Sequence, residues 1–356
     1  MTEPQSKNWK LLERRPIAAG RGRIVCVANQ KGGVAKTTTS VNLAAGLALR
    51  GHPVLVVDVD PQSNAATGLG IDHRTVERST YDLLLGDATL DDVVLPTAIK
   101  NLHCAPASLD LAGAEVELVS TMARERRLGE ALAGAVERYE LIFLDCPPSL
   151  GLLTVNALAA AQDLFVPVQC EYYALEGLGQ LLGNAERVRR SLNPDLRIAG
   201  FLLTMYDGRT KLSSQVENDV RSHFGELVFK TRIPRSVRLS EAPSFGEPVL
   251  TLDPASRGAV SYRLLAAEVE ALYGLEVHKP PPPPAGPVEP MPEVVASRPS
   301  TPGPGGRGYG VKTARPNVPD SVWPRREPFS TQYRLGDAPA QTKHRLGDAP
   351  AQVEAP

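Results

Sequence analysis

The residues best suited to chemistry lie in a glycine-containing turn between an apolar run and a helical pattern. The turn reads KGGVAKTT and follows the β-branched run 24–28. Backbone N–H groups in such a turn can surround an anion, and the helix that follows adds the positive end of its dipole. Lys36 offers a charge to the β- and γ-phosphates of a nucleotide, and Thr37 offers a hydroxyl to Mg²⁺. We therefore predict a phosphate site made of Lys31, Gly32, Gly33, Val34, Ala35, Lys36, Thr37 and Thr38.

Aspartates at the ends of two other apolar runs would supply the acidic part of this site. Asp58 and Asp60 follow the run 54–57, and Asp145 follows the run 141–144. If the first strand continues, Asp58 and Asp60 face the same side, so that one can lie near Mg²⁺ and the other can orient the attacking water. A carboxylate at a strand end typically holds Mg²⁺ through water, which predicts a metal site formed by Thr37, Asp145 and one of the two aspartates at 58 and 60. The prolines that follow Asp145 would stiffen a loop able to sense the γ-phosphate.

The elements that must position these residues alternate along the chain. Short apolar runs, typical of buried strands, occur at 24–28, 54–57, 141–144, 164–168 and 198–203. Helical patterns lie between or after them, at 36–50, 175–192, 212–224 and 261–273. Strands of this kind with helical crossovers predict an α/β fold with a doubly wound, mainly parallel sheet covered by helices on both faces. Ligand sites in such folds lie at the carboxyl ends of the strands.

Composition divides the 356 residues unevenly. Of the 32 prolines, 18 fall within 280–356, and the octapeptide RLGDAPAQ occurs at 334–341 and again at 345–352. A segment so rich in proline does not build a core. We therefore predict an N-terminal extension (1–22), one nucleotide-binding domain (23–275) and a low-complexity tail without stable structure (276–356).

Charge and cysteine usage exclude several classes of protein. The net charge is −1, so the chain lacks the strongly basic surface of a general polyanion binder, although a local basic patch remains possible. The four cysteines form no CxxC pair, and three of them lie in apolar or strand-like runs, where a buried free thiol is expected. No N-terminal signal peptide and no membrane-spanning apolar stretch is recognised, so no membrane association is expected.

The turn departs from the strict P-loop pattern GxxxxGK[ST], because Gln30 and Ala35 stand where glycines are required. It resembles the deviant Walker A motif, KGGVGKTT, of the ParA/MinD/nitrogenase iron protein group of P-loop NTPases. Ala35 replaces a glycine of that motif and adopts a positive φ less easily, so nucleotide affinity or dimer closure could be altered. From about residue 23 to 274 the chain resembles chromosomal ParA (Soj-type) ATPases, notably in the strings at 62–70, 111–118, 167–177 and 238–244.

The resemblance implies roles for several residues. Lys31 would reach the partner's nucleotide in an ATP-dependent homodimer, and hydrolysis would depend on Asp60, so that Lys31, Lys36 and Asp60 are the expected catalytic residues. Asp58 would then be the aspartate near the metal, beside Thr37 and Asp145. Glu171 would lie near a ribose across the dimer, while Met205 and Pro234 would flank the adenine. ATP and Mg²⁺ are the implied cofactors.

The resemblance also implies partners. Members of this family segregate replicated chromosomes or plasmids: ATP-bound dimers coat the nucleoid by binding duplex DNA non-specifically, and a ParB-like centromere-binding protein stimulates hydrolysis and releases them. The expected location is cytoplasmic and nucleoid-associated. The DNA contacts are predicted at Arg209, Lys211, Arg235 and Arg238, of which the last two belong to the segment 230–238, which has four basic residues and no acid. Because one protomer offers a modest patch, useful affinity would require the dimer.

Four alternatives remain at the level of sequence. A MinD-like positioning ATPase would need a C-terminal amphipathic helix, where this chain has prolines. A reductase like the nitrogenase iron protein would need cluster-ligating cysteines. An ATP-dependent amidoligase would need a substrate motif that is not recognised here. A scaffold with weak ATPase activity is suggested by Ala35 and by the long tail.

Overall fold

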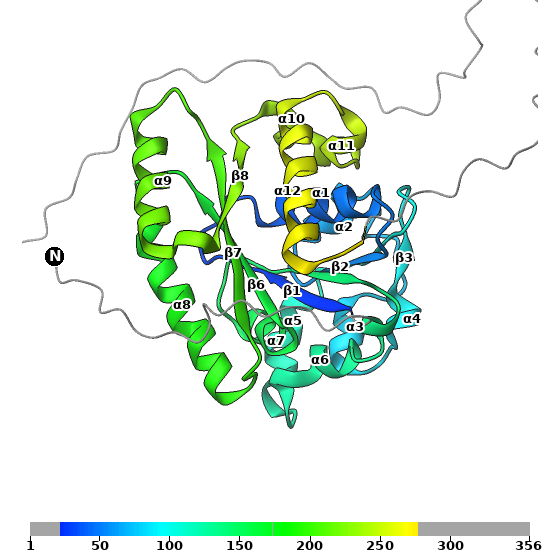
Figure 1. Cartoon of the computed structure of the whole chain (residues 1–356). Coiled ribbons are helices and arrows are strands. Elements are labelled where there is room, and N and C mark those ends of the chain that lie inside the picture. Colours follow the sequence, from blue (N-terminus) through cyan, green and yellow to red (C-terminus); the bar gives the residue numbers. More distant parts are fainter. Residues whose placement is uncertain (1–21, 173, 277–356) are drawn as a thin grey trace, which may run out of the picture. The chain divides into compact units, whose positions relative to one another are not determined.

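The computed structural model describes residues 22–172 and 174–276 (Figure 1). Apart from Gly22 and Glu276, the predicted N-terminal extension and the predicted tail with its octapeptide repeat lie outside the described residues. The chain divides into one unit of residues 1–285, which holds every described residue, and a second of residues 286–356, which holds none. The fold below is therefore that of the predicted nucleotide-binding domain.

The centre of the domain is an eight-stranded sheet with the strand order β3-β4-β2-β5-β1-β6-β7-β8. All neighbouring strands are parallel except β3 and β4, which pair antiparallel at one edge. The strands are β1 (Arg23–Val27), β2 (Val54–Asp58), β3 (Leu95–Pro96), β4 (Leu102–Ala105), β5 (Leu141–Asp145), β6 (Asp163–Gln169), β7 (Arg197–Tyr206) and β8 (Val228–Pro234). The prediction of a doubly wound, mainly parallel sheet is confirmed.

Helices connect the strands and lie on both faces of the sheet (Figure 1). In the described residues they are α1 (Lys36–Ala48), α2 (Asn64–Gly68), α3 (Thr80–Leu85), α4 (Leu90–Val93), α5 (Leu111–Glu117), α6 (Arg127–Ala131), α7 (Leu152–Ala160), α8 (Ala174–Ser191), α9 (Lys211–Phe224), α10 (Val237–Glu241), α11 (Val249–Leu252) and α12 (Arg257–Tyr273). Five short 3₁₀ turns complete them: η2 (Leu118–Ser120), η3 (Arg124–Arg126), η4 (Ala135–Glu137), η5 (Gly225–Leu227) and η6 (Ala242–Phe245). No helix among these is long and apolar enough to cross a membrane.

Two hydrophobic cores lie on opposite faces of the sheet because successive side chains of a strand alternate between faces. In β1, Ile24 and Cys26 belong to the core beneath α3–α9, whereas Val25 and Val27 belong to the core beneath α1, α2 and α10–α12. Burial on both faces explains why β1, β2 and β5 read as continuous apolar runs rather than alternating ones.

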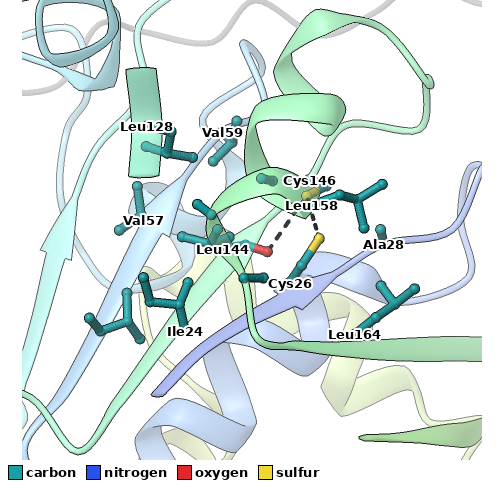
Figure 2. Close-up of a cluster of buried hydrophobic side chains, with 14 of the residues drawn as sticks. Ile24, Cys26, Ala28, Val57, Val59, Leu128, Leu144, Cys146, Leu158 and Leu164 are labelled. Carbon is teal, nitrogen blue, oxygen red and sulfur yellow. Dashed lines mark hydrogen bonds between the residues drawn. The ribbon is translucent and has the colours of Figure 1, made fainter. Parts of the chain in front are cut away.

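The cysteines are part of these cores. All four are buried and free, whereas the sequence predicted this for three of them. Cys26 and Cys146 lie side by side with their sulfur atoms 3.4 Å apart, packed among Ile24, Val57, Leu144 and Leu158 (Figure 2). The hydrogen bond with the Cys26 thiol, together with burial, raises the pKa of Cys146 well above its ordinary value, so this thiol is a poor nucleophile that packs as an apolar side chain.

Helix α1 is held from several sides. The Thr39 hydroxyl lies 3.2 Å from the Tyr262 hydroxyl of α12, and the Asn42 side chain accepts a hydrogen bond from the Val249 amide of α11 (2.8 Å). Gly46 allows α12 to approach closely, because a Cβ there would lie 3.2 Å from the Cβ of Ala266. The helix that begins at the predicted phosphate loop is therefore locked between the sheet and α12.

Candidate nucleotide site

The predicted phosphate loop connects β1 to α1 and lies at the carboxyl end of the sheet, where the fold class predicts a site. Gly33 and Ala35 both have left-handed backbones, with φ of 74° and 69°. Backbone φ is thus positive at 33, not positive at 34 and positive again at 35, and an alternation of this kind makes successive N–H groups converge on an anion. Gly32 and Gly33 are exposed and face open space, since a Cβ at either would meet no atom within 4 Å. The loop therefore has the shape of an anion cradle with room for a phosphate.

Two lysines of the loop lie in different environments. Lys36 is buried, and its Nζ donates to the Lys31 carbonyl at 3.4 Å. Burial lowers the pKa of Lys36, while the Asp145 carboxylate opposes that shift. The Lys31 side chain is 38% exposed and points its Nζ at the Glu171 carboxylate, 3.2 Å away. Lys36 is thus placed as a fixed charge inside the cradle, and Lys31 as a cation at its rim.

Asp145 lies at the centre of the acidic part of the site. Its Oδ2 accepts a hydrogen bond from the Thr37 hydroxyl at 2.7 Å, and its Oδ1 accepts one from the Ser40 hydroxyl at 2.8 Å. Burial raises the pKa of Asp145 to about 6, opposed chiefly by the hydrogen bonds from Thr37 and Ser40. The predicted metal ligands Thr37 and Asp145 are therefore in direct contact.

Asp58 and Asp60 are arranged differently from the expectation. Strand β2 ends at Asp58, so strand alternation does not place the two carboxylates on one face. Asp58 instead accepts hydrogen bonds from the backbone amides of Asp60 (3.1 Å), Ala65 (3.0 Å) and Ala66 (3.2 Å). Burial, with Asp145 beside it in the sheet register, raises the pKa of Asp58 well above its ordinary value. These contacts favour Asp58 as the organiser of the loop that carries Asp60.

The oxygen atoms of this site fit a magnesium ion. Mg²⁺ is usually bound through one or two protein oxygens together with substrate phosphates, and the Thr37 hydroxyl and the Asp145 carboxylate are such oxygens beside the phosphate cradle. Within residues 22–172 and 174–276 no three His, Cys, Asp or Glu side chains gather into a metal cluster. When bound, the ion supplies charge neutralisation at the phosphates.

Glu171 joins two parts of the site that are distant in sequence. One carboxylate oxygen is 3.2 Å from the Lys31 Nζ, and the other accepts from the Gln169 amide at 2.6 Å and lies 3.4 Å from Arg235. A predicted nucleotide residue, Glu171, thus contacts a predicted DNA residue, Arg235. The predicted position of Glu171 beside a ribose across a dimer stays a prediction.

The residues predicted to flank the adenine lie at the ends of β7 and β8. Tyr206, next to Met205, pairs in the strand register with Pro234, and Met205 has a strained left-handed backbone with φ of 50°. Pro234 lines a hollow of about 390 Å³ at this edge of the sheet. The other lining residues are Tyr206, Asp207, Gly208, Arg209, Arg235 and Arg257.

The predicted DNA residues are exposed, and most are paired with carboxylates. Arg209 pairs with Asp207 at 2.7 Å, and its side chain is 90% exposed. Arg238 pairs with Glu241 and Asp253 at 3.1 and 3.3 Å. Lys211 begins α9 and lines a hollow next to Arg209. The structure brings Arg209 and Arg235 to one hollow, whereas Arg238 lines neither of these two hollows.

Sequence reasoning missed three residues at the site. Ser40 and Thr204 are fully buried hydroxyls that hold Asp145 and the phosphate loop, and Arg257 joins the arginines at the end of β8. The threonine string in which Thr37 occurs gives no sign that Ser40 turns inward, and Thr204 lies 170 residues from its partner, Val34. Only the folded chain brings these residues to the site.

The site combines a glycine-containing loop between β1 and α1 with a buried lysine and a hydroxyl at the start of α1. The hydroxyl contacts an aspartate at the end of a neighbouring parallel strand. This arrangement defines the class of P-loop nucleoside triphosphatases. A family model described as an AAA domain matches residues 22–198. The sporulation initiation inhibitor protein Soj of Bacillus subtilis is 56% identical over 250 residues, which are 70% of this chain and 99% of Soj. The chromosome partitioning protein ParA of Myxococcus xanthus is 51% identical over 266 residues, covering 72% and 94% of the two chains. The chain belongs to the ParA/Soj family of chromosome-partitioning ATPases.

Solved structures agree with this assignment of the fold. The crystal structure of cobyrinic acid a,c-diamide synthase from Mycobacterium smegmatis, with bound ATP analogue and magnesium, has a TM-score of 0.62 and 40% identity. The match covers 70% of this chain and 94% of that chain. The predicted family, ATP hydrolase activity and use of ATP and Mg²⁺ are thereby confirmed.

Proposed function

We propose that this ATPase moves DNA by an ATP-dependent cycle of dimerisation and DNA binding. The ATP-bound homodimer binds duplex DNA non-specifically on the nucleoid, in the cytoplasm. A ParB-like centromere-binding partner stimulates slow hydrolysis and releases the dimer from DNA. The observation that carries this proposal is the position of exposed arginines at the same edge of the sheet as the phosphate loop.

The basic residues stand out against an acidic background. Residues 1–279 carry 30 basic and 33 acidic side chains, yet Arg209, Arg235 and Arg257 surround one hollow. Exposed arginines bind phosphates without regard to base sequence, and each contact makes the affinity depend on salt. Their ion pairs are no obstacle, because exposed pairs such as Arg209–Asp207 contribute little stability and exchange easily for a phosphate.

The site also supports ATP as the link between protomers. The Lys31 Nζ lies at the rim of the cradle, on a half-exposed side chain held by a surface ion pair. A lysine in that position can leave Glu171 for a phosphate brought by a second protomer at small cost. Two protomers then place twice the number of arginines on one DNA segment, which raises the effective affinity without a new contact.

Hydrolysis needs positioning and charge stabilisation more than covalent chemistry. Lys36 offers a buried positive charge to the transferred phosphoryl group, and Thr37 with Asp145 holds the side of the cradle where the metal would lie. Asp60 is only 7% exposed, and one of its oxygens accepts the Gln62 amide at 3.0 Å. We assign Asp60 to orient the attacking water.

The decisive experiment measures binding to a non-specific DNA duplex with ATP, with ADP and without nucleotide, at two salt concentrations. We expect salt-sensitive binding with ATP alone. Equal binding in all three states would contradict the proposal. Arg209→Ala should weaken binding, and Arg138→Ala is a matched control, since Arg138 is also an exposed arginine paired with an aspartate, Asp91, but follows η4 before β5 begins, at the opposite end of the sheet.

An ATP-dependent ligase is the second candidate, because the diamide synthase named above shares 40% identity. Such an enzyme would hydrolyse ATP only with an organic acid and a nitrogen donor present. ATP turnover stimulated by DNA and a ParB-like protein, without either co-substrate, would favour partitioning. The higher identity to Soj and ParA already points that way.

A further inference from the structure

The phosphate loop contains a strained residue whose conformation must be held by something outside the loop. Ala35 has φ of 69° and ψ of 37°, a left-handed backbone that glycine adopts freely and alanine does not. It stands at the N-cap of α1, and its carbonyl accepts the Thr39 amide at 3.0 Å, the first hydrogen bond of that helix. The loop therefore starts α1 through a residue that disfavours the required backbone.

The contact that holds this backbone comes from the sheet. The Thr204 hydroxyl on β7 donates to the Val34 carbonyl at 3.0 Å, and both residues are almost completely buried. Thr204 is itself tied into the sheet, because it pairs in register with Gln169 of β6 and its carbonyl accepts the Cys170 amide at 3.1 Å. The hydroxyl is thus a rigid donor aimed at the peptide that joins Val34 to Ala35.

A hydrogen bond to the carbonyl of a planar peptide also fixes the direction of its N–H. In a trans peptide the carbonyl and the next N–H point in opposite directions, so a Val34 carbonyl turned towards β7 turns the Ala35 N–H away from it. Within the part of the chain that the structure describes, the Ala35 amide has no hydrogen-bond acceptor. It is a donor held ready for a ligand in a loop whose neighbouring amides converge.

We propose that Thr204 is a positioning residue for nucleotide binding, which holds the strained Ala35 peptide so that its N–H faces the phosphates. With a glycine at position 35 the same backbone would need little support. With alanine, loss of the anchor lets the peptide relax out of the left-handed region and turns the N–H away. This inference concerns nucleotide binding and does not depend on DNA binding or dimerisation.

The test is a double-mutant cycle on nucleotide affinity, measured with a fluorescent ATP analogue on the full chain. Thr204→Val keeps the shape and removes the hydroxyl, and we expect about tenfold weaker binding, as for loss of one buried hydrogen bond. In the Ala35→Gly background the same substitution should cost about threefold or less, because glycine reaches the positive φ without help. Thr204→Ser, which keeps the hydroxyl, should bind within about twofold of the parent.

A matched control separates positioning from general stability. Thr80 is an equally buried threonine on α3, whose hydroxyl lies 3.2 Å from the Pro106 carbonyl, away from the phosphate loop. Thr80→Val should lower the unfolding temperature and leave nucleotide affinity unchanged. An equal loss of affinity from Thr204→Val in the alanine and glycine backgrounds would overturn the proposal. If Thr204→Val does not fold alone, restoration of folding and binding by Ala35→Gly supports it, and failure to restore them refutes it.

Discussion

The exchange of an ion pair for a DNA phosphate at Arg209 makes a quantitative prediction. The Arg209 side chain is 90% exposed and pairs with the nearby Asp207 carboxylate, whose pKa it holds below the ordinary value. The four predicted DNA contacts of each protomer, Arg209, Lys211, Arg235 and Arg238, give eight phosphate contacts in a dimer. The logarithm of the affinity for DNA should therefore fall with the logarithm of the salt concentration with a slope of about −7. Arg209→Ala removes two contacts from the dimer and should bring the slope to about −5.

The loss of these two contacts can be measured as a salt-dependent change in the ratio of parent to variant affinity for DNA. Between about 50 and 200 mM salt, a slope difference of about 1.8 shrinks the affinity gap between parent and variant by about tenfold. Fluorescence anisotropy of a labelled non-specific duplex, with a non-hydrolysable ATP analogue to keep the dimer assembled, gives both slopes. The Arg138→Ala control should keep the parent slope. An Arg209→Ala slope equal to that of the parent would refute the assignment of Arg209 to the DNA surface.

Three further predictions concern turnover, assembly and pH. Asp60→Ala should retain ATP and DNA binding and lose at least about 100-fold in turnover, measured by phosphate release, because the water would no longer be oriented; normal turnover would move that role to another residue. Lys31→Ala should bind ATP as a monomer in sedimentation experiments, and an ATP-dependent dimer would show that Lys31 does not bridge protomers. The hydrogen bond from Arg189, opposed by burial, lowers the pKa of Glu186 from 4.5 to about 2. The Glu186–Arg189 interaction therefore stabilises the folded state above pH 4.5, and this stabilisation is lost as the pH falls towards 2. Glu186→Gln should cost about 1 kcal/mol in urea unfolding at neutral pH and progressively less in acid, and a constant difference across that range would disprove the linkage.

The buried strands could be predicted from the sequence because each one is a short, continuous run of apolar residues. Residues 54–57 and 141–144 are apolar on both faces, and β2 and β5 extend each run by only one residue, the aspartate. Strand β8 was missed, since at the sheet edge it follows two consecutive buried residues, Val228 and Phe229, with exposed Lys230 and Arg232, and its sequence was interpreted as a basic segment. Helix α12 begins at Arg257 rather than at 261, because the Ser256 hydroxyl caps it by accepting the Ala259 amide.

The site was predictable to the extent that one continuous segment forms it. The lysines and Thr37 belong to the loop itself, and the strand-end aspartates follow from parallel strands meeting at one edge. The backbone of Ala35 was expected to resist a positive φ, and the structure shows that it adopts one. The supporting contacts of Ser40 and Thr204 escape any single-sequence pattern, because they join residues by tertiary packing rather than by spacing.

The contacts that hold α1 against α11 and α12 determine which segments can change conformation when a nucleotide binds. Since Thr39, Asn42 and Gly46 tie this helix to α11 and α12, the phosphate loop cannot travel along the helix axis when a phosphate enters. The loop therefore keeps its position, and we expect the conformational change on nucleotide binding in the segments that follow β5 and β6. Asp145, at the end of β5, and Glu171, after β6, contact residues of the loop and of the start of α1. Amide exchange should accordingly leave 39–48, where the hydrogen bonds of α1 begin, protected in every nucleotide state, and report the γ-phosphate at 146, 149–151 and 170–172.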